Sequence, residues 1–352
     1  MRALLILVYV ALVLTSCKEG ETSIPSAKAI EIVTPNGFPS VPVPTNNPMT
    51  AEGVKLGKML FFDPILSKDN SISCGSCHDP KLAFATNNRF EKGVGGKIGD
   101  LNSMPLFNIA YANEFFWNGR EEVLDHQAFG PIMDPIEMDN SLPNVVSRIK
   151  LNEEYVDLFR IVFQDEKINP ERVAKVIGQF ERTILSGSAK IDSIDFFNKT
   201  AFDLFIEGKL SQSEYNGAQI FFSERGDCFH CHGSILGTDY FFHNNGLDSD
   251  IEGKGRGAVT ENAQDDGKFK TPSVRNLAFT APYMHDGRFS NLKQVVDFYS
   301  SGVKFSETID PLMKKADKGG IQLSEDEKTD LINFLLIYTD SSFVNNPEFQ
   351  GS

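Results

Sequence analysis

Two short motifs of the same form, Cys-x-x-Cys-His, constrain this chain more than any other feature of its sequence. They occupy residues 74–78 and 228–232 and contain four of the five cysteines. In such a motif the two thiols add to the vinyl groups of a haem, and the adjacent imidazole becomes a ligand of the iron. The sequence therefore predicts two covalently bound c-type haems, held by Cys74, Cys77 and His78 and by Cys228, Cys231 and His232.

Zinc sites and thioredoxin-like redox pairs also use paired cysteines. A zinc site does not require an adjacent histidine twice, and a redox pair belongs beside a βαβ unit. Strand patterns are scarce in this sequence, which disfavours that second alternative. His230, inside the second motif, is interpreted as a bystander because the iron ligand is the residue after the second cysteine.

Helical periodicity precedes each motif. Residues 50–62 and 211–222 both place apolar side chains on one helical face and end in a double Phe, with Gly53 matched to Gly217, which indicates an internal duplication. Two further helices are predicted at 169–187, with a capping Asn and a following Pro, and at 324–340, with a capping box. The predicted fold is mostly α, in two halves that meet near residue 200.

The first 17 residues have the layout of an export signal. Arg2 is followed by an apolar stretch at 3–14, which is shorter than the ~20 residues that cross a bilayer. The closing Leu-Thr-Ser-Cys resembles the lipobox of bacterial lipoproteins, which predicts lipidation of Cys17; ordinary cleavage is the alternative. Residues 18–48, rich in Pro, Ser, Thr and Asn, are predicted to be a flexible tether.

The charge of the chain bears on its partners. Its formal net charge is −14. Nucleic-acid phosphates would be repelled, so nucleic acid is not an expected partner, whereas a basic or mostly apolar protein is compatible with this charge.

The loop after the first motif supplies candidate acid–base groups. Two haems serve only electron transfer unless one iron keeps an open position beside such groups. Each candidate, taken alone, also has an ordinary structural explanation. The candidates at 112–139 are the single tryptophan and four polar residues: Trp117, Arg120, His126, Gln127 and Glu137.

The same loop carries a family resemblance. The stretches FFWNGR, QAFGP and IEMD, in this order after a Cys-x-x-Cys-His motif, resemble the bacterial di-haem cytochrome c peroxidase family, which includes the MauG-like enzymes. KTPSVRNLAFTAPYMHDGRFSNL at 270–292 extends the match, which covers roughly residues 50–340. The resemblance implies two cytochrome c-like haem domains in tandem, a peroxidatic one at 49–198 and an electron-transfer one at 199–352.

The resemblance also implies roles for single residues. The haem on His78 would reduce hydrogen peroxide, with Glu137 as distal acid and base and Gln127 orienting the peroxide. Trp117 would conduct electrons between the haems. A calcium ion between the domains would be held by Asn102 and by backbone oxygens of Thr280 and Pro282. His126 matches poorly, and His243 and His285 are interpreted as structural.

Two departures from the family pattern bear on the chemistry. Standard members have a His in the loop after the first motif that must leave the iron before peroxide enters; Val94 stands there in this chain, which implies that the first haem is open without reductive activation. Met104 is an alternative ligand in that loop, although packing explains it too. At the second haem Tyr299 replaces the usual Met, as in the MauG-like branch, with Met284 as the other candidate ligand and a core role as the plain alternative for Tyr299.

The expected function is reduction of hydrogen peroxide to water with electrons from a small redox protein, a cytochrome c or a cupredoxin. One alternative is a MauG-like enzyme that oxidises a protein substrate through a high-valent iron state, and another is a non-catalytic di-haem electron carrier. The expected location is the periplasmic side of a bacterial membrane, contacted only through the lipid anchor. The oligomeric state stays open, with a homodimer as one option.

Overall fold

The computed structural model describes residues 24–196 and 198–351. The predictions of an export signal and of lipidation at Cys17 lie outside these residues. Within them, no helix combines the length and the apolar character needed to span a bilayer.

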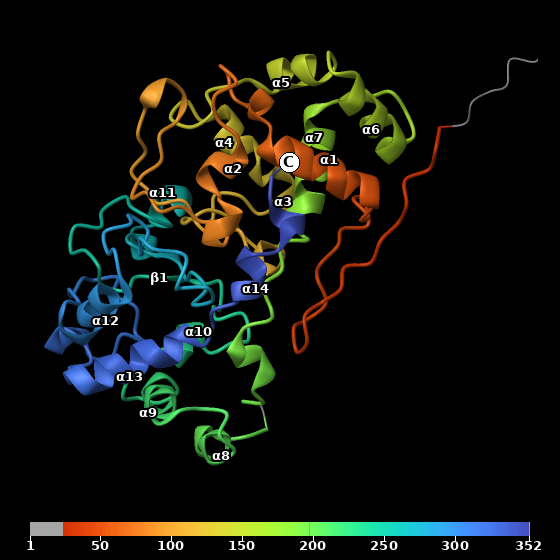
Figure 1. Ribbon diagram of the computed structural model, residues 1–352. Coiled ribbons are helices and arrows are strands. Elements are labelled where there is room, and N and C mark those ends of the chain that lie inside the picture. Colours follow the sequence, from red (N-terminus) through yellow and green to blue (C-terminus); the bar gives the residue numbers. More distant parts are fainter. Residues whose placement is uncertain (1–23, 197, 352) are drawn as a thin grey trace, which may run out of the picture.

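Helices dominate the fold and form two lobes (Figure 1). One lobe is built from residues before about 190 and the other mainly from residues after 200, each around its own apolar cluster. Two short strands, β1 (Phe242–His243) and β2 (Phe269–Lys270), pair antiparallel in the second lobe. The helices are α1 (Ala51–Phe62), α2 (Cys74–Cys77), α3 (Leu124–Gln127), α4 (Phe129–Met133), α5 (Leu142–Ile149), α6 (Glu153–Phe163), α7 (Pro170–Glu181), α8 (Ala201–Ile206), α9 (Gln212–Phe221), α10 (Phe229–His232), α11 (Gly257–Thr260), α12 (Leu292–Ser301), α13 (Glu325–Leu336) and α14 (Ser341–Val344).

The ends of the main helices are set by local side chains. Thr50 caps α1 by accepting a hydrogen bond from the backbone N–H of Gly53, and Asn169 caps α7 in the same way through Arg172. Reciprocal capping boxes begin α9 and α13. These caps satisfy backbone donors that have no partner inside a helix, so the predicted helix starts are confirmed.

The internal duplication is visible in how the helices cross. Helix α1 packs on α7 and α9 packs on α13. A Cβ atom on Gly57 would lie 1.8 Å from the carbonyl oxygen of Val176, and one on Gly217 would lie 2.1 Å from that of Asp330. The match to Gly217 is therefore Gly57, one turn further along the helix than Gly53, because the glycine must stand where the two backbones touch.

A double Phe follows each of these glycines and packs on the partner helix. The Phe61 and Phe180 ring centroids are 5.2 Å apart, and those of Phe221 and Phe334 are 5.3 Å apart. A similar ring contact occurs in both lobes. Each pair of crossing helices therefore places packed aromatic rings next to its Cys-x-x-Cys-His motif.

Residues 24–48 of the predicted tether lie against the folded body. Ala29 forms a β-bridge with Thr50, and the side chain of Asn47 is buried and donates to Asp125 at 2.9 Å. Phe38 packs on Tyr111 of the first lobe and lies under the guanidinium of Arg275 from the second. This segment therefore contacts both lobes. The partners of its few apolar side chains could not be predicted from its composition.

The end of the chain returns to the first lobe. In Figure 1, helix α14 lies between the two lobes, and the chain after it ends beside α1. Phe343 and Phe349 pack on the buried ring of Phe84, at centroid distances of 6.0 and 5.7 Å. The last residues of the predicted domain at 199–352 thus complete the core of the first lobe.

Candidate active site

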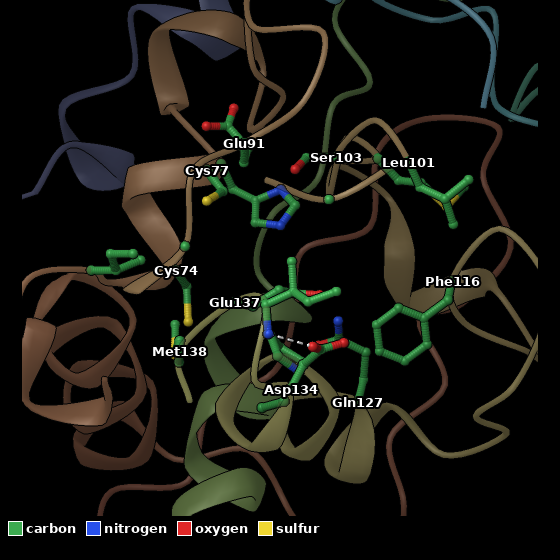
Figure 2. Close-up of a pocket in the computed structure, with 18 of the residues that line it drawn as sticks. Cys74, Cys77, Glu91, Leu101, Ser103, Phe116, Gln127, Asp134, Glu137 and Met138 are labelled. Carbon is green, nitrogen blue, oxygen red and sulfur yellow. Dashed lines mark hydrogen bonds between the residues drawn. The ribbon is translucent and has the colours of Figure 1, made fainter. Parts of the chain in front are cut away.

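The first cavity gathers the site residues predicted for the amino-terminal half. Its wall includes Cys74, Cys77 and His78, together with Gln127 and Glu137. In Figure 2, Cys77 lies across the cavity from Gln127 and Glu137. The motif and the later loop, about 50 residues apart in sequence, therefore face one space.

Both motif histidines are held in the same way. Nδ1 of His78 lies 3.1 Å from the carbonyl oxygen of Phe84, and Nδ1 of His232 lies 2.9 Å from that of Gly237. A carbonyl only accepts hydrogen bonds, so Nδ1 carries the proton and Nε2 keeps its lone pair. Burial lowers the pKa of His78 to about 4 and lowers that of His232, so both rings are neutral, as an iron ligand requires.

The four motif thiols are free and face the two cavities. Burial raises the pKa of Cys77 and of Cys228 to about 12, so these sulfurs stay protonated and carry no charge. The second cavity has largely apolar walls that include Val274, Leu277 and Val296. Uncharged thiols, a neutral imidazole with a free nitrogen and an apolar wall fit a c-type haem in each lobe.

The first cavity is also lined by the carboxyl-bearing residue Glu137. Burial raises its pKa, the negative charge of Asp134 adds to this, and the positive charge of Arg120 opposes it. Its backbone N–H donates to the carbonyl of Asp134 at 3.0 Å (Figure 2). Arg120 stacks its guanidinium on Phe116, 3.5 Å from the ring centroid. The carboxyl can therefore hold a proton at a higher pH than an ordinary glutamate.

The backbone of Glu137 is fixed by the loop that lacks the family histidine. Val94 is buried, and its N–H donates to the carbonyl oxygen of Glu137 at 2.8 Å. Gly93 packs so closely that a Cβ atom there would lie 1.7 Å from the carbonyl oxygen of Ile136. Met104 also lines this cavity. The loop thus supports the backbone of Glu137.

Trp117 lies between the two cavities. Both cavities are lined by Trp117 and Asn102, and the indole Nε1 donates to the carbonyl oxygen of Asn102 at 2.7 Å. On the side of the second cavity, the His285 ring stands edge-on to the indole, with centroids 6.4 Å apart, and stacks on Phe269 at 3.7 Å. The tryptophan is therefore a shared, rigidly held wall.

The second cavity contains both candidate distal ligands. Cys228, Cys231 and His232 line it together with Tyr299 and Met284. Burial raises the pKa of Tyr299 to about 12, and a hydrogen bond from the side chain of Asn245 acts in the opposite direction. Both the tyrosine and the methionine are therefore candidate iron ligands in the second cavity.

Comparison with known proteins decides the family. A sequence model described as di-haem cytochrome c peroxidase matches residues 51–201. Methylamine utilization protein MauG of Methylorubrum extorquens is 36% identical over 298 residues, covering 84% of this chain and 80% of the relative. The chain belongs to the di-haem cytochrome c peroxidase family.

Other relatives agree with this placement. Cytochrome-c peroxidase IdrP1 of a Pseudomonas species is 34% identical and covers 85% of this chain and 83% of the relative. The crystal structure of a MauG-like protein associated with microbial copper homeostasis superposes with a TM-score of 0.80 at 31% identity, covering 92% of this chain and 99% of that one. The predicted family, the tandem haem-domain fold and two c-type haems are confirmed at this level.

The residues that would hold the calcium ion of the di-haem peroxidase family also meet in the structure. Asn102, Thr280 and Pro282 all line the second cavity. The side-chain amide nitrogen of Asn102 donates to the backbone oxygens of Asn88 and Arg89, which turns its Oδ1 away from them. Calcium itself stays a prediction.

The remaining histidines contact neighbouring side chains, and for them a structural role stays a prediction. His243 lies between Asp239 and Asp310, at 2.9 and 2.6 Å, and these two carboxylates raise its pKa to about 12. His126 stacks on Phe129. His230 lies at the edge of the second lobe, where Lys314 contacts its ring nitrogen.

Sequence reasoning missed one buried acid of the first cavity. Glu181 is 2% exposed and lines the first cavity, and its Oε2 has no hydrogen-bond partner among the described residues. Burial raises its pKa to about 8. A signal was present, because residue 181 lies four after Ile177 and three before Ile184, on the apolar stripe of that helix.

Proposed function

We propose that this protein reduces hydrogen peroxide to water with two electrons from a small redox protein, a cytochrome c or a cupredoxin. One observation carries the proposal: Gln127 and Glu137 share a cavity with the first motif, and Val94 stands where a displaceable histidine ligand would be. The distal side of that cavity thus holds acid–base and hydrogen-bonding groups.

The chemistry assigns separate tasks to the side chains. When bound, the haem supplies the iron that binds peroxide and takes part in cleavage of the O–O bond. The Glu137 carboxylate accepts the proton of the inner peroxide oxygen and returns it to the outer one, which leaves as water. The Gln127 amide donates a hydrogen bond that orients the peroxide, and Trp117 connects this cavity electronically with the second one.

A second candidate function is oxidation of a protein substrate, as in the MauG-like branch. It is favoured by Tyr299 in the second cavity, because an anionic oxygen ligand stabilises oxidised iron whereas a thioether favours the reduced form. Two relatives that bear the name MauG are 36% and 32% identical to this chain. The shared cavity and the acid–base groups serve this reaction equally well.

The location and the further ligands belong to the same proposal. We place the protein on the periplasmic side of a bacterial membrane, held by a lipid on Cys17. A calcium ion on Asn102, Thr280 and Pro282 would fix the shared wall beside Trp117, since hard cations take oxygen ligands.

Mixing the untreated ferric holoprotein with hydrogen peroxide tests the function. The haem spectrum should change at once, without prior reduction, and reduced cytochrome c or a reduced cupredoxin should restore it. Restoration by a protein substrate in place of these donors would favour the MauG-like reaction. If the haem spectrum does not change on addition of peroxide, cyanide or azide, the protein is an electron carrier and the proposal is refuted.

Gly93→Ala tests how the loop supports Glu137. The added methyl group must displace the Ile136–Glu137 backbone, and a misplacement of about 1 Å at a reacting group can cost about 100-fold in rate. We expect peroxide cleavage to slow by at least about tenfold with both haems attached, as measured by stopped-flow absorbance. Ile98→Ala in the same loop is the control, because Ile98 is 58% exposed and is not among the residues that line the cavity. Equal rates in the two variants would contradict this role.

A further inference from the structure

One side-chain amide contacts both candidate ligands of the second cavity. Asn245 lies in the loop after β1 and lines that cavity. Its Nδ2 donates to the hydroxyl oxygen of Tyr299 at 3.1 Å and lies 3.8 Å from the sulfur of Met284. The two atoms that compete for the iron therefore share a hydrogen-bond donor.

The orientation of this amide is set by its other end. Oδ1 of Asn245 accepts a hydrogen bond from the backbone N–H of Leu247 at 3.3 Å. Rotating the amide by half a turn would point an NH2 group at that N–H and an oxygen at the methionine sulfur. The donor therefore faces Tyr299 and Met284.

Neighbouring residues hold the loop that carries Asn245. The side chain of Asn244 is buried and donates to the hydroxyl groups of Ser306 and Thr308, at 3.0 and 2.9 Å. On the other side, the carbonyl of Gly246 accepts from the backbone N–H of Lys304 at 2.8 Å. Asn245 is thus anchored on both sides and cannot follow a ligand that moves.

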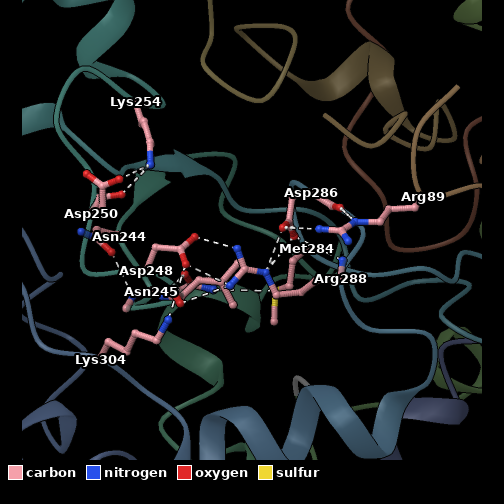
Figure 3. Close-up of polar contacts among 12 residues, drawn as sticks. Arg89, Asn244, Asn245, Asp248, Asp250, Lys254, Met284, Asp286, Arg288 and Lys304 are labelled. Atoms are coloured by element: carbon pink, nitrogen blue, oxygen red, sulfur yellow. Dashed lines mark hydrogen bonds and ion pairs between the residues drawn. The ribbon is translucent and has the colours of Figure 1, made fainter. Parts of the chain in front are cut away.

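An ion-pair cluster ties this loop to the segment that carries Met284 (Figure 3). Arg288 pairs with Asp248 at 2.7 Å and with Asp286 at 2.9 Å. Asp248 lies three residues after Asn245. Asp286 also pairs with Arg89 of the first lobe. The spacing between the amide and the methionine is therefore fixed by charged contacts outside the cavity.

We propose that Asn245 is the positioning residue that selects Tyr299 over Met284 as distal ligand of the second haem. An N–H group bonds an anionic oxygen strongly and a thioether sulfur weakly, so the same donor stabilises oxygen ligation more. Loss of such a partner of a metal ligand typically costs about 10–100-fold in metal affinity or activity. The inference rests on the proposed haem site of the second cavity and is independent of peroxide turnover.

The test compares ferric holoproteins without peroxide. In Asn245→Leu, the ratio of oxygen-ligated to sulfur-ligated second haem should fall by about tenfold or more. The methionine-to-iron charge-transfer band should appear and the reduction potential of that haem should rise. Asn245→Asp, which keeps the shape and removes the donor, should act in the same direction and serves if the leucine variant loses its second haem.

Two further variants make the result specific. In Asn245→Leu combined with Met284→Leu, the new band should disappear, because its source is gone. Asp250→Asn, at an exposed position of the same loop, should leave the spectrum and the potential unchanged. The proposal is overturned if both Asn245 variants keep the wild-type spectrum and potential, or if the wild type already shows methionine ligation. Thermal unfolding followed through the second haem reports whether the second lobe of each variant is folded.

Discussion

Replacing Glu137 by Gln is expected to slow peroxide cleavage by ~100-fold or more while both haems stay attached, the usual scale for a lost acid–base group. Glutamine has nearly the same shape, so the cavity and the Val94 contact to the backbone of residue 137 remain. What disappears is the group that carries a proton from one peroxide oxygen to the other. Stopped-flow absorbance after peroxide addition measures the rate, and haem absorbance per protein checks attachment.

The pH dependence of the same rate identifies the group. Glu137 must be ionised to accept the first proton, and its pKa lies above the ordinary value of 4.5. The wild-type rate should therefore fall as the pH drops through this raised pKa, and Glu137→Gln should lose that limb. Asp134→Asn removes a negative neighbour that raises the pKa, so the limb should move to lower pH. Near-normal rates in Glu137→Gln would end the assignment.

The sequence could predict the part of the site that depends on short, local patterns. A Cys-x-x-Cys-His motif contains both thiols and the ligand in five positions, and the helix periods follow from side chains three or four apart. The distal residues were reachable through the family resemblance, because Gln127 and Glu137 lie on one recognisable stretch. Their meeting with the motif in one cavity is what the structure adds.

What the sequence could not show depends on contacts between distant segments. Asn245 meets Tyr299 across 54 residues, and nothing near either residue predicts the pair. Phe38 finds its place between the lobes although its surroundings read as a linker. The matching glycine was misplaced by one helical turn because periodicity gives a face, whereas the backbone contact that requires glycine comes from another helix.

Those glycines support a prediction about stability, in which Gly57→Ala and Gly217→Ala each destabilise one lobe. In a helix interior, alanine is more favourable than glycine by about 1 kcal/mol. The added methyl group, however, meets a backbone carbonyl oxygen that cannot rotate away, at 1.8 or 2.1 Å. Overpacking typically costs about 1–3 kcal/mol and sometimes more. We expect a cost near the top of that range and therefore, after the propensity gain, a net loss of about 2 kcal/mol, a large part of the roughly 5–15 kcal/mol of a typical protein.

The stabilities of the two glycine variants are compared with each other and with that of a surface substitution. Thermal unfolding, followed through the spectrum of each haem, should show an earlier transition at the first haem in Gly57→Ala and at the second in Gly217→Ala, since each crossing supports its own motif. Lys55→Ala, on an exposed side of α1, should change stability by less than about 0.5 kcal/mol. If either glycine variant is as stable as wild type, the helices can separate freely at that crossing. The duplicated close contact would then not be what holds the two haem sites in their matching geometry.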